Sequence, residues 1–166
     1  PVASANGIGQ GGYGNIVNIS VTIVRPGRIL CHIHAFSGHR CIDVSRDPCK
    51  TYLDTHALGF DTVLTSGAAS SCLLGMETIG RLLRQREEHQ GPEVLIGSGV
   101  NASAIAAFRA AYPQARAFHM SGKTDVASSM IFRREGVPMG LPGLDEWHIQ
   151  QTSEAYVRAA RAALEE

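Results

Sequence analysis

The sequence has neither a long apolar run nor an excess of charge of one sign. No stretch approaches the roughly 20 apolar residues that a membrane-spanning helix needs. Among the 166 residues, 15 Lys and Arg balance 15 Asp and Glu. The chain therefore has no net charge that would draw it to nucleic acid or to an anionic membrane surface. We expect neither nucleic acid nor a membrane as a partner.

Cysteine is scarce and irregularly spaced. The four cysteines, at positions 31, 41, 49 and 72, match neither a disulfide framework nor a zinc ribbon. The first residues also lack the basic and apolar regions of a secretion signal. These absences predict a protein of the reducing cytoplasm. The remaining composition, 44% hydrophobic and 18% charged, is typical of a globular domain with its own core.

The clearest pattern in the chain is a strand, a glycine-rich turn, a helix and a second strand. Residues 93–96 form a short apolar run that Gly97-Ser98-Gly99 closes, which predicts a buried strand. Asn101 or Ser103 can cap the helix that follows. Residues 115–120 then resume an extended pattern. A strand, helix and strand within about 30 residues predict a βαβ unit with parallel strands.

Patterns on either side predict the other elements of an α/β domain over residues 15–166. Residues 1–14, rich in Gly, Ala, Ser and Asn, are expected to be loosely ordered. Runs of β-branched and apolar residues predict strands at 16–24, 28–36 and 61–64. Residues 37–41, 126–132 and 136–144 are predicted to be loops.

Three further helices are predicted from capping residues and apolar spacing. The first begins at Pro48 behind an Asp47 cap and ends at His56 or Leu58. The second begins at Ser70 or Ser71 and carries an apolar face at helical spacing. The third occupies residues 153–166 and has charge pairs four residues apart.

Four separate motifs lie at residues 59–67, 96–101, 118–121 and 130–140. In their order and spacing they resemble the CutC family of copper homeostasis proteins. The resemblance implies a TIM-type barrel of parallel strands with a pocket at the strands' carboxyl ends. It also implies a copper homeostasis protein that binds copper ion, with an undefined molecular activity.

The resemblance covers only part of the family's barrel. The predicted strands at 61–64, 93–96 and 115–120 resemble the last three of eight, and residues 19–27 resemble the third. Because a TIM barrel needs at least about 200 residues, we expect an incomplete barrel with an open sheet. An open sheet predicts poor stability or association into a homo-oligomer.

The family's fifth strand and its His-Arg-Ala-Phe-Asp motif are matched less directly. Residues 29–36 resemble this strand, with Ala35-Phe36 and the later Asp43 as the end of the motif. In this alignment residues 37–42 are an insertion, and the motif's His and Arg fall on Ile33 and His34.

Polar residues that follow the predicted parallel strands form the candidate ligand rim, because the carboxyl ends of such strands share one edge. Gly97 and Gly99 allow a close backbone approach, and amides that open a helix can hold an anion. An enzyme acting on a small anionic or phosphorylated substrate is therefore the alternative function, with His119 as general acid or base. The catalytic candidates are His119 and Ser121, and the ligand-binding candidates are Thr65, Ser66, Gly97, Ser98, Gly99, Asn101, Lys123 and Arg133.

Simpler structural explanations stand beside these assignments. The glycines can serve only to make tight turns, His119 can hydrogen-bond within the barrel mouth, and Arg133 can lie in a solvated loop. A third interpretation is a structural or interaction protein, because an incomplete barrel would have no chemistry left.

Soft ligands gather between residues 31 and 41. Thiolate and imidazole groups select copper(I), and five Cys and His residues lie in this stretch. The predicted metal ligands are Cys31, His34 and Cys41, with copper(I) as the ion. Free cysteines are also commonly small buried apolar residues, which is the expectation for Cys49 and Cys72.

Overall fold

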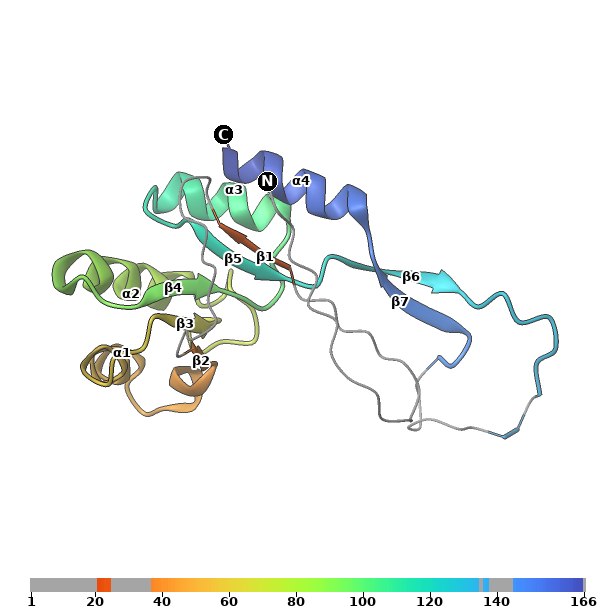
Figure 1. Ribbon diagram of the computed structural model, residues 1–166, viewed down its shortest axis with the longest axis horizontal. Helices are drawn as coiled ribbons and strands as arrows, with labels where there is room; N and C mark the ends of the chain where they lie inside the picture. The colour runs from red at the N-terminus through yellow and green to blue at the C-terminus, as the bar shows by residue number, and fades with distance from the viewer. Residues whose placement is uncertain (1–20, 25–36, 135, 138–144, 166) are drawn as a thin grey trace.

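The computed structural model describes residues 21–24, 37–134, 136–137 and 145–165. Within them the chain forms a five-stranded sheet in the order β1-β5-β4-β3-β2 and a separate two-stranded sheet, β6-β7 (Figure 1). The strands are β1 Val21–Val24, β2 Ser37–His39, β3 Thr62–Thr65, β4 Glu93–Ile96, β5 Ala117–Met120, β6 Lys123–Ala127 and β7 His148–Thr152. The helices are α1 Pro48–Ala57, α2 Met76–His89, α3 Ala102–Ala111 and α4 Glu154–Glu165, with a short 3-10 helix, η1, at Cys41–Val44.

The main sheet is parallel from β2 through β5. β2 pairs with β3, β3 with β4 and β4 with β5, all in the parallel sense. The predicted α/β class and the central βαβ unit, β4-α3-β5, are therefore confirmed. β1 pairs antiparallel with β5, so the expectation of a barrel strand parallel to the others is wrong for residues 21–24.

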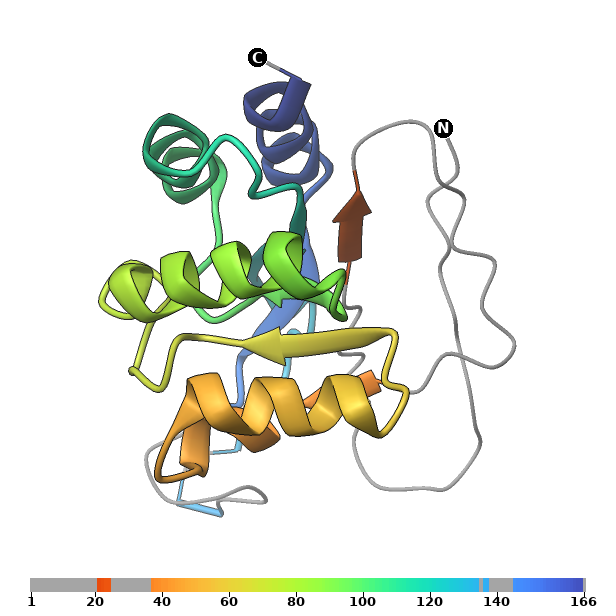
Figure 2. The same ribbon diagram turned by 90° about the vertical axis from the view of Figure 1, so that its left-hand side faces the viewer.

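Helices α1, α2 and α3 pack against one face of this sheet, and in Figure 2 they lie one above another. The core joins strand residues such as Val63, Ile96 and Phe118 to apolar residues of α1, α2 and α3. Tyr52 of α1 is fully buried, and its hydroxyl donates to the Pro92 carbonyl at 2.6 Å, just before β4. Ala160 and Leu164 bring α4 into the same core. None of the helices among the described residues is long and apolar enough to cross a membrane.

The capping predictions succeed at α1 and α3 and fail at α2. The Asp47 side chain accepts from the amides of Cys49 and Lys50 and so caps α1. α2 begins at Met76 behind Gly75, not at Ser70 or Ser71. Residues 70–75 form turns instead, because the Cys72 amide donates to the Ser98 carbonyl at 2.9 Å and so ties this segment to the loop after β4.

Parts of two predicted loops, residues 37–39 and 126–127, are strands in the structure. Residues 37–39 of the predicted loop form β2, whose pairing with β3 supplies backbone hydrogen bonds that local sequence does not reveal. β6 includes Val126 and Ala127, and it pairs with β7, which lies about twenty residues later in the chain. The predictions for residues 1–20 and 28–36 concern parts of the chain outside the residues that the structure describes.

Candidate functional site

A buried carboxylate, Asp43, organises the carboxyl edge of the sheet. Its side chain is 5% exposed. It accepts from the Thr65 hydroxyl at 2.5 Å, from the Ser66 amide at 3.0 Å and from the Ala68 amide at 3.0 Å. Burial raises the pKa of the Asp43 carboxyl, but these hydrogen bonds and that from Arg40 outweigh it and hold the pKa below its ordinary value. Asp43 is therefore a fixed negative charge that positions the loop after β3.

Arg40 is the accessible partner of this carboxylate. Its Nε donates to Asp43 at 2.9 Å and its Nη2 donates to the Ser66 hydroxyl at 2.6 Å. These contacts orient the guanidinium, yet 42% of the side chain remains exposed. A guanidinium held in one plane and open to solvent can bind a carboxylate or a phosphate through two parallel hydrogen bonds.

Backbone strain gathers at the same edge. Three residues other than glycine have positive φ within three residues of the end of a parallel strand: Arg40 after β2 (51°), Ala68 after β3 (57°) and Ser98 after β4 (73°). Each such conformation costs of order 1 to 3 kcal/mol and persists only where the surrounding structure enforces it. Such positions cluster at ligand sites, so their repetition at successive strand ends marks this edge as the candidate site.

His39 and His119 face the same side of the sheet. His39 pairs in register with Leu64, Leu64 with Leu95, and Leu95 with Ala117. His119 is two residues beyond Ala117 and so shares that face, which is opposite to the helix-covered core. Burial, and second the nearby charge of His39, lower the pKa of His119. The His119 imidazole is therefore neutral at neutral pH and can accept a proton or a soft metal ion.

The glycine-rich turn after β4 fits closely between its neighbours. A Cβ at Gly97 would lie 2.6 Å from Leu64 Cδ1 and 3.9 Å from His119 Cβ, so a larger residue would require the Leu64 side chain to shift. The Gly97 amide donates to the Thr65 carbonyl at 2.9 Å, and the Ser98 hydroxyl donates to the Ser70 carbonyl at 2.9 Å. Seven of the predicted catalytic and ligand-binding residues thus lie at or just beyond the carboxyl ends of adjacent strands: Thr65, Ser66, Gly97, Ser98, Gly99, His119 and Ser121.

Three of the predicted ligand residues have other partners. The Asn101 side chain accepts from the Ala104 amide at 2.9 Å and caps α3. Lys123 lies on β6 and donates to Gln150 of β7. The Arg133 guanidinium lies 5.0 Å from the centre of the Trp147 ring, in the segment between β6 and β7. For Lys123 and Arg133 the structure therefore favours a place in the two-stranded unit over one at the strand edge.

The predicted copper ligands are described only in part. Cys31 and His34 lie outside the described residues, and Cys41 is an exposed free thiol at the start of η1. The residues that the structure describes include no group of three or more His, Cys, Asp or Glu side chains that could hold a metal ion. Cys72 is fully buried in the core and Cys49 packs against it, as expected for small apolar residues.

Sequence reasoning missed Arg40 and gave Asp43 the wrong neighbours. The segment His39-Arg40-Cys41-Ile42-Asp43 has His, Arg and Asp at the spacing of the His-Arg-Ala-Phe-Asp motif, without an insertion. The structure places it at the end of β2, next to β3. The assignment of this motif to Ile33 and His34 is therefore corrected, and the unbroken spacing was the signal that could have revealed it.

Fold and site together define an α/β protein with a largely parallel sheet and a candidate ligand site at the strands' carboxyl edge. The sequence model of the CutC family matches residues 3–124, so the chain belongs to the CutC family.

Individual relatives agree with this assignment. A CutC family protein of Chromobacterium violaceum is 40% identical over 149 residues, which are 89% of this chain and 59% of the relative. One of Xanthomonas campestris is 46% identical over 92 residues, 55% of this chain and 37% of the relative. One of Porphyromonas gingivalis is 37% identical over 123 residues, 74% of this chain and 48% of the relative. The chain thus spans about half the length of these relatives.

Proposed function

We propose that the chain acts in copper homeostasis through a ligand site at the carboxyl edge of β2 to β5. Membership of the CutC family supports this role. Because the chain spans about half the length of its relatives, the role of the whole family protein is part of this proposal. The observation that carries the location is the Asp43 network, in which a buried carboxylate fixes an accessible Arg40. Because 42% of the Arg40 side chain is open to solvent, a ligand can reach the guanidinium that Asp43 orients.

The proposal includes a partial TIM-type barrel in the reducing cytoplasm. Four parallel strands with α1, α2 and α3 on one face support the barrel. The free thiols of Cys41, Cys49 and Cys72 support the reducing compartment.

The ligand class that this edge favours is a small anion. The Nε and Nη2 of Arg40 bind Asp43 and Ser66, and among the described residues its Nη1 has no partner. A phosphate or a carboxylate complements that free side of the guanidinium. His119, whose lowered pKa leaves it neutral, lies beside Gly97 and would serve as general acid or base if the site is catalytic.

Calorimetric titration with inorganic phosphate, and separately with acetate, tests this ligand class. The protein should bind at least one of the two anions at low ionic strength, and Arg40→Gln should abolish that binding. Arg84→Gln, which removes an exposed arginine of α2, is the matched control and should bind like the wild type. Binding that survives Arg40→Gln would place the anion elsewhere and contradict the proposal.

Copper(I) is the second candidate ligand, favoured by soft donors at the same edge. His39 and His119 share one face, and Cys41 is exposed two residues beyond His39. Imidazole and thiolate both suit copper(I). Cys31 and His34 remain proposed ligands on the basis of sequence alone.

Titration with copper(I) against a competing chelator separates two sets of copper ligands. Loss of binding in Cys31→Ser/Cys41→Ser would assign the ion to the cysteine cluster, and loss in His39→Ala/His119→Ala would assign it to the strand edge. His56→Ala removes an exposed histidine and is the control, and circular dichroism checks that each variant is folded. A folded wild type that binds no copper(I) would remove copper as a direct ligand.

A further inference from the structure

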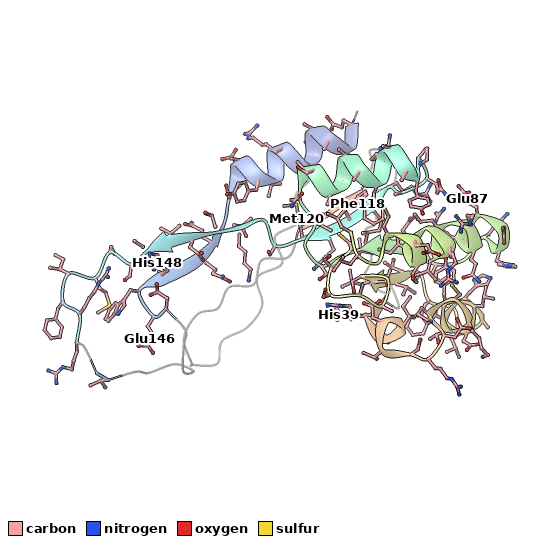
Figure 3. The ribbon with its side chains drawn as sticks, turned by 180° about the vertical axis from the view of Figure 1, so that it is seen from behind. His39, Glu87, Phe118, Met120, Glu146 and His148 are labelled. Carbon is pink, nitrogen blue, oxygen red and sulfur yellow. The ribbon has the colours of Figure 1, made fainter. Side chains whose placement is uncertain are left out.

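The β6–β7 ribbon extends away from the body of the molecule (Figure 1). His148 and Glu146 lie at its far part, well away from His39 in the body (Figure 3). β6 and β7 pair antiparallel from Lys123↔Thr152 to Ala127↔His148. In the described part of the chain no third strand joins this ribbon. Most of it follows residue 124, where the match to the family ends.

The ribbon leaves apolar side chains open to solvent. Val126 and Ile149 are a cross-strand pair on one face and are 40% and 55% exposed. Ile131 and Phe132, a few residues beyond β6, are 100% and 68% exposed. A two-stranded ribbon is at best marginally stable alone in water, and gathered exposed apolar residues mark an interaction surface.

The charges of β6 are complementary to those of a second β6. When two copies run antiparallel with Thr124 opposite Thr124, Lys123 of each copy faces Asp125 of the other. Opposite charges and paired threonines at facing positions stabilise an antiparallel pair. A shift of two residues places Lys opposite Lys, or Asp opposite Asp, so the charges favour one alignment. β7 carries no Asp, Glu, Lys or Arg and offers no such selection.

The contacts within the ribbon leave this edge able to pair. Among the described residues, the Lys123 ammonium donates to the exposed Gln150 side chain and to no other group, and no ion pair involves Asp125. Lys123 and Asp125 alternate with Thr124 and Val126 along the strand, so they lie on the face opposite to Val126. Pairing would therefore place salt bridges on one face, and Thr124 with the Val126–Ile149 pair of each copy on the other.

We propose that β6 is a docking edge for β6 of a second copy of this chain. The two ribbons form one four-stranded antiparallel sheet in the order β7-β6-β6-β7, with a two-fold axis at Thr124. Such an interface is isologous and closed, and strand addition at a free sheet edge is a common recognition mode. This inference concerns assembly and does not depend on the ligand proposed for the strand edge.

Charge reversal at the two central positions tests the alignment. Sedimentation velocity over a range of concentrations should show a dimer for the wild type. Lys123→Asp and Asp125→Lys each convert two attractive pairs into two like-charge pairs. Each should weaken dimerisation at least about tenfold, which corresponds to roughly 1.4 kcal/mol. Arg84→Glu reverses an exposed charge on α2 and should dimerise like the wild type.

Mixing the two variants gives the decisive result. The aspartate introduced in one chain then faces the lysine introduced in the other, so the mixture should form heterodimers with affinity near that of the wild type. The double variant Lys123→Asp/Asp125→Lys should likewise dimerise with itself. Circular dichroism confirms that all variants are folded. A wild type that stays monomeric, single variants that dimerise normally, or a mixture that fails to associate would each overturn the proposal.

Discussion

At the scale of single residues, Asp43 connects two segments that are separate in the sequence, residues 40–43 and residues 65–68. It joins Arg40 to the hydroxyl of Thr65 and to the amides of Ser66 and Ala68. A charged acceptor strengthens each of these bonds. The loop after β3 therefore depends on the charge of Asp43 as well as on its size.

Asp43→Asn keeps the size and removes the charge. We expect a loss of about 1 to 3 kcal/mol in the free energy of unfolding, because several buried donors lose an ionised acceptor. Urea unfolding at neutral pH measures this loss. Asp54→Asn, which alters an exposed ion pair with Lys50, is the control and should change stability by less than about 1 kcal/mol. Equal effects of the two substitutions would contradict the role of Asp43.

The direction in which pH changes the stabilisation by Asp43 follows from its pKa. The pKa of Asp43 in the folded state lies below its ordinary value of 3.8, so the unfolded chain takes up the proton first. The stabilisation by Asp43 is thus complete above that ordinary value and is lost as the pH falls through the lower folded pKa. The difference in stability between wild type and Asp43→Asn should shrink as the pH is lowered below about 4. A difference that stays constant down to the folded pKa would show that the charge is not involved.

His119 gives a separate pH response near neutrality. Its folded pKa is below the ordinary value of 6.5, so protonation favours the unfolded state. The contribution of neutral His119 to the free energy of unfolding is therefore present above pH 6.5 and is lost as the pH falls through the folded pKa. We expect the decline in stability below that pH to be smaller in His119→Gln than in the wild type. Proton NMR of the imidazole signals supplies the direct check, since a pKa of 6.5 or higher for His119 would contradict it.

At the scale of elements, the loop between β3 and α2 depends on contact between two glycine backbones. A Cβ at Gly67 would overlap the backbone carbonyl of Gly75. Gly67 also has φ +75°, a conformation that costs other residues about 1 to 2 kcal/mol. Close approach and left-handed backbone together demand glycine here.

Comparing Gly67→Ala with Gly59→Ala separates these two requirements. Gly59 has a similar φ of +78°, but a Cβ there would meet nothing within 4 Å. Gly59→Ala should cost only the backbone strain, whereas Gly67→Ala should cost at least about 3 kcal/mol because overpacking is added. Thermal and urea unfolding measure both. Equal losses would mean that the loop moves freely away from Gly75.

Two substitutions of Asn101, which lies at the N-terminus of α3, distinguish a capping role from a ligand-binding role. Because the Asn101 side chain accepts from the Ala104 amide, Asn101→Ala should lower the free energy of unfolding by about 1 kcal/mol. Asn101→Asp retains a capping oxygen and should keep most of the stability. If both variants bind phosphate like the wild type, Asn101 is a cap alone, contrary to its predicted ligand role.

At the scale of the whole molecule, the chain returns from the β6–β7 ribbon to complete its own core. α4 follows the ribbon and packs beside α3 (Figure 1). Leu164 is 1% exposed and Ala160 is fully buried. The ribbon therefore connects two parts of a single core, and its ends are fixed even though its strands are exposed.

Leu164→Ala tests whether α4 is part of the cooperative unit. Deleting a buried leucine side chain costs about 2 to 5 kcal/mol, and we expect a loss in this range with one unfolding transition. Tyr156→Ala, in the same helix at 53% exposure, should cost much less. An early separate transition for Leu164→Ala would show instead that α4 detaches independently of the sheet.

Local patterns were sufficient for the elements whose partners are near in the sequence. The Asp47 and Asn101 caps, the buried strand at 93–96 and the βαβ unit were predicted because capping, apolar periodicity and short crossovers are local properties. α2 was misplaced because its start is fixed by the Cys72 amide and the Ser98 carbonyl. β2 and β6 were missed because their pairing partners are distant strands.

The sequence by itself determined the α/β class, the family motifs and the strand ends at which polar residues gather, since each is set by the order of residues along the chain. Only the tertiary structure decided that Asp43 holds Arg40 and the β3 loop, and that His39 and His119 share one face. It also decided that Lys123 and Asp125 lie on the edge of an exposed ribbon. The physical reason is that hydrogen bonds, electrostatic coupling and strand register between distant segments depend on how the sheet is assembled.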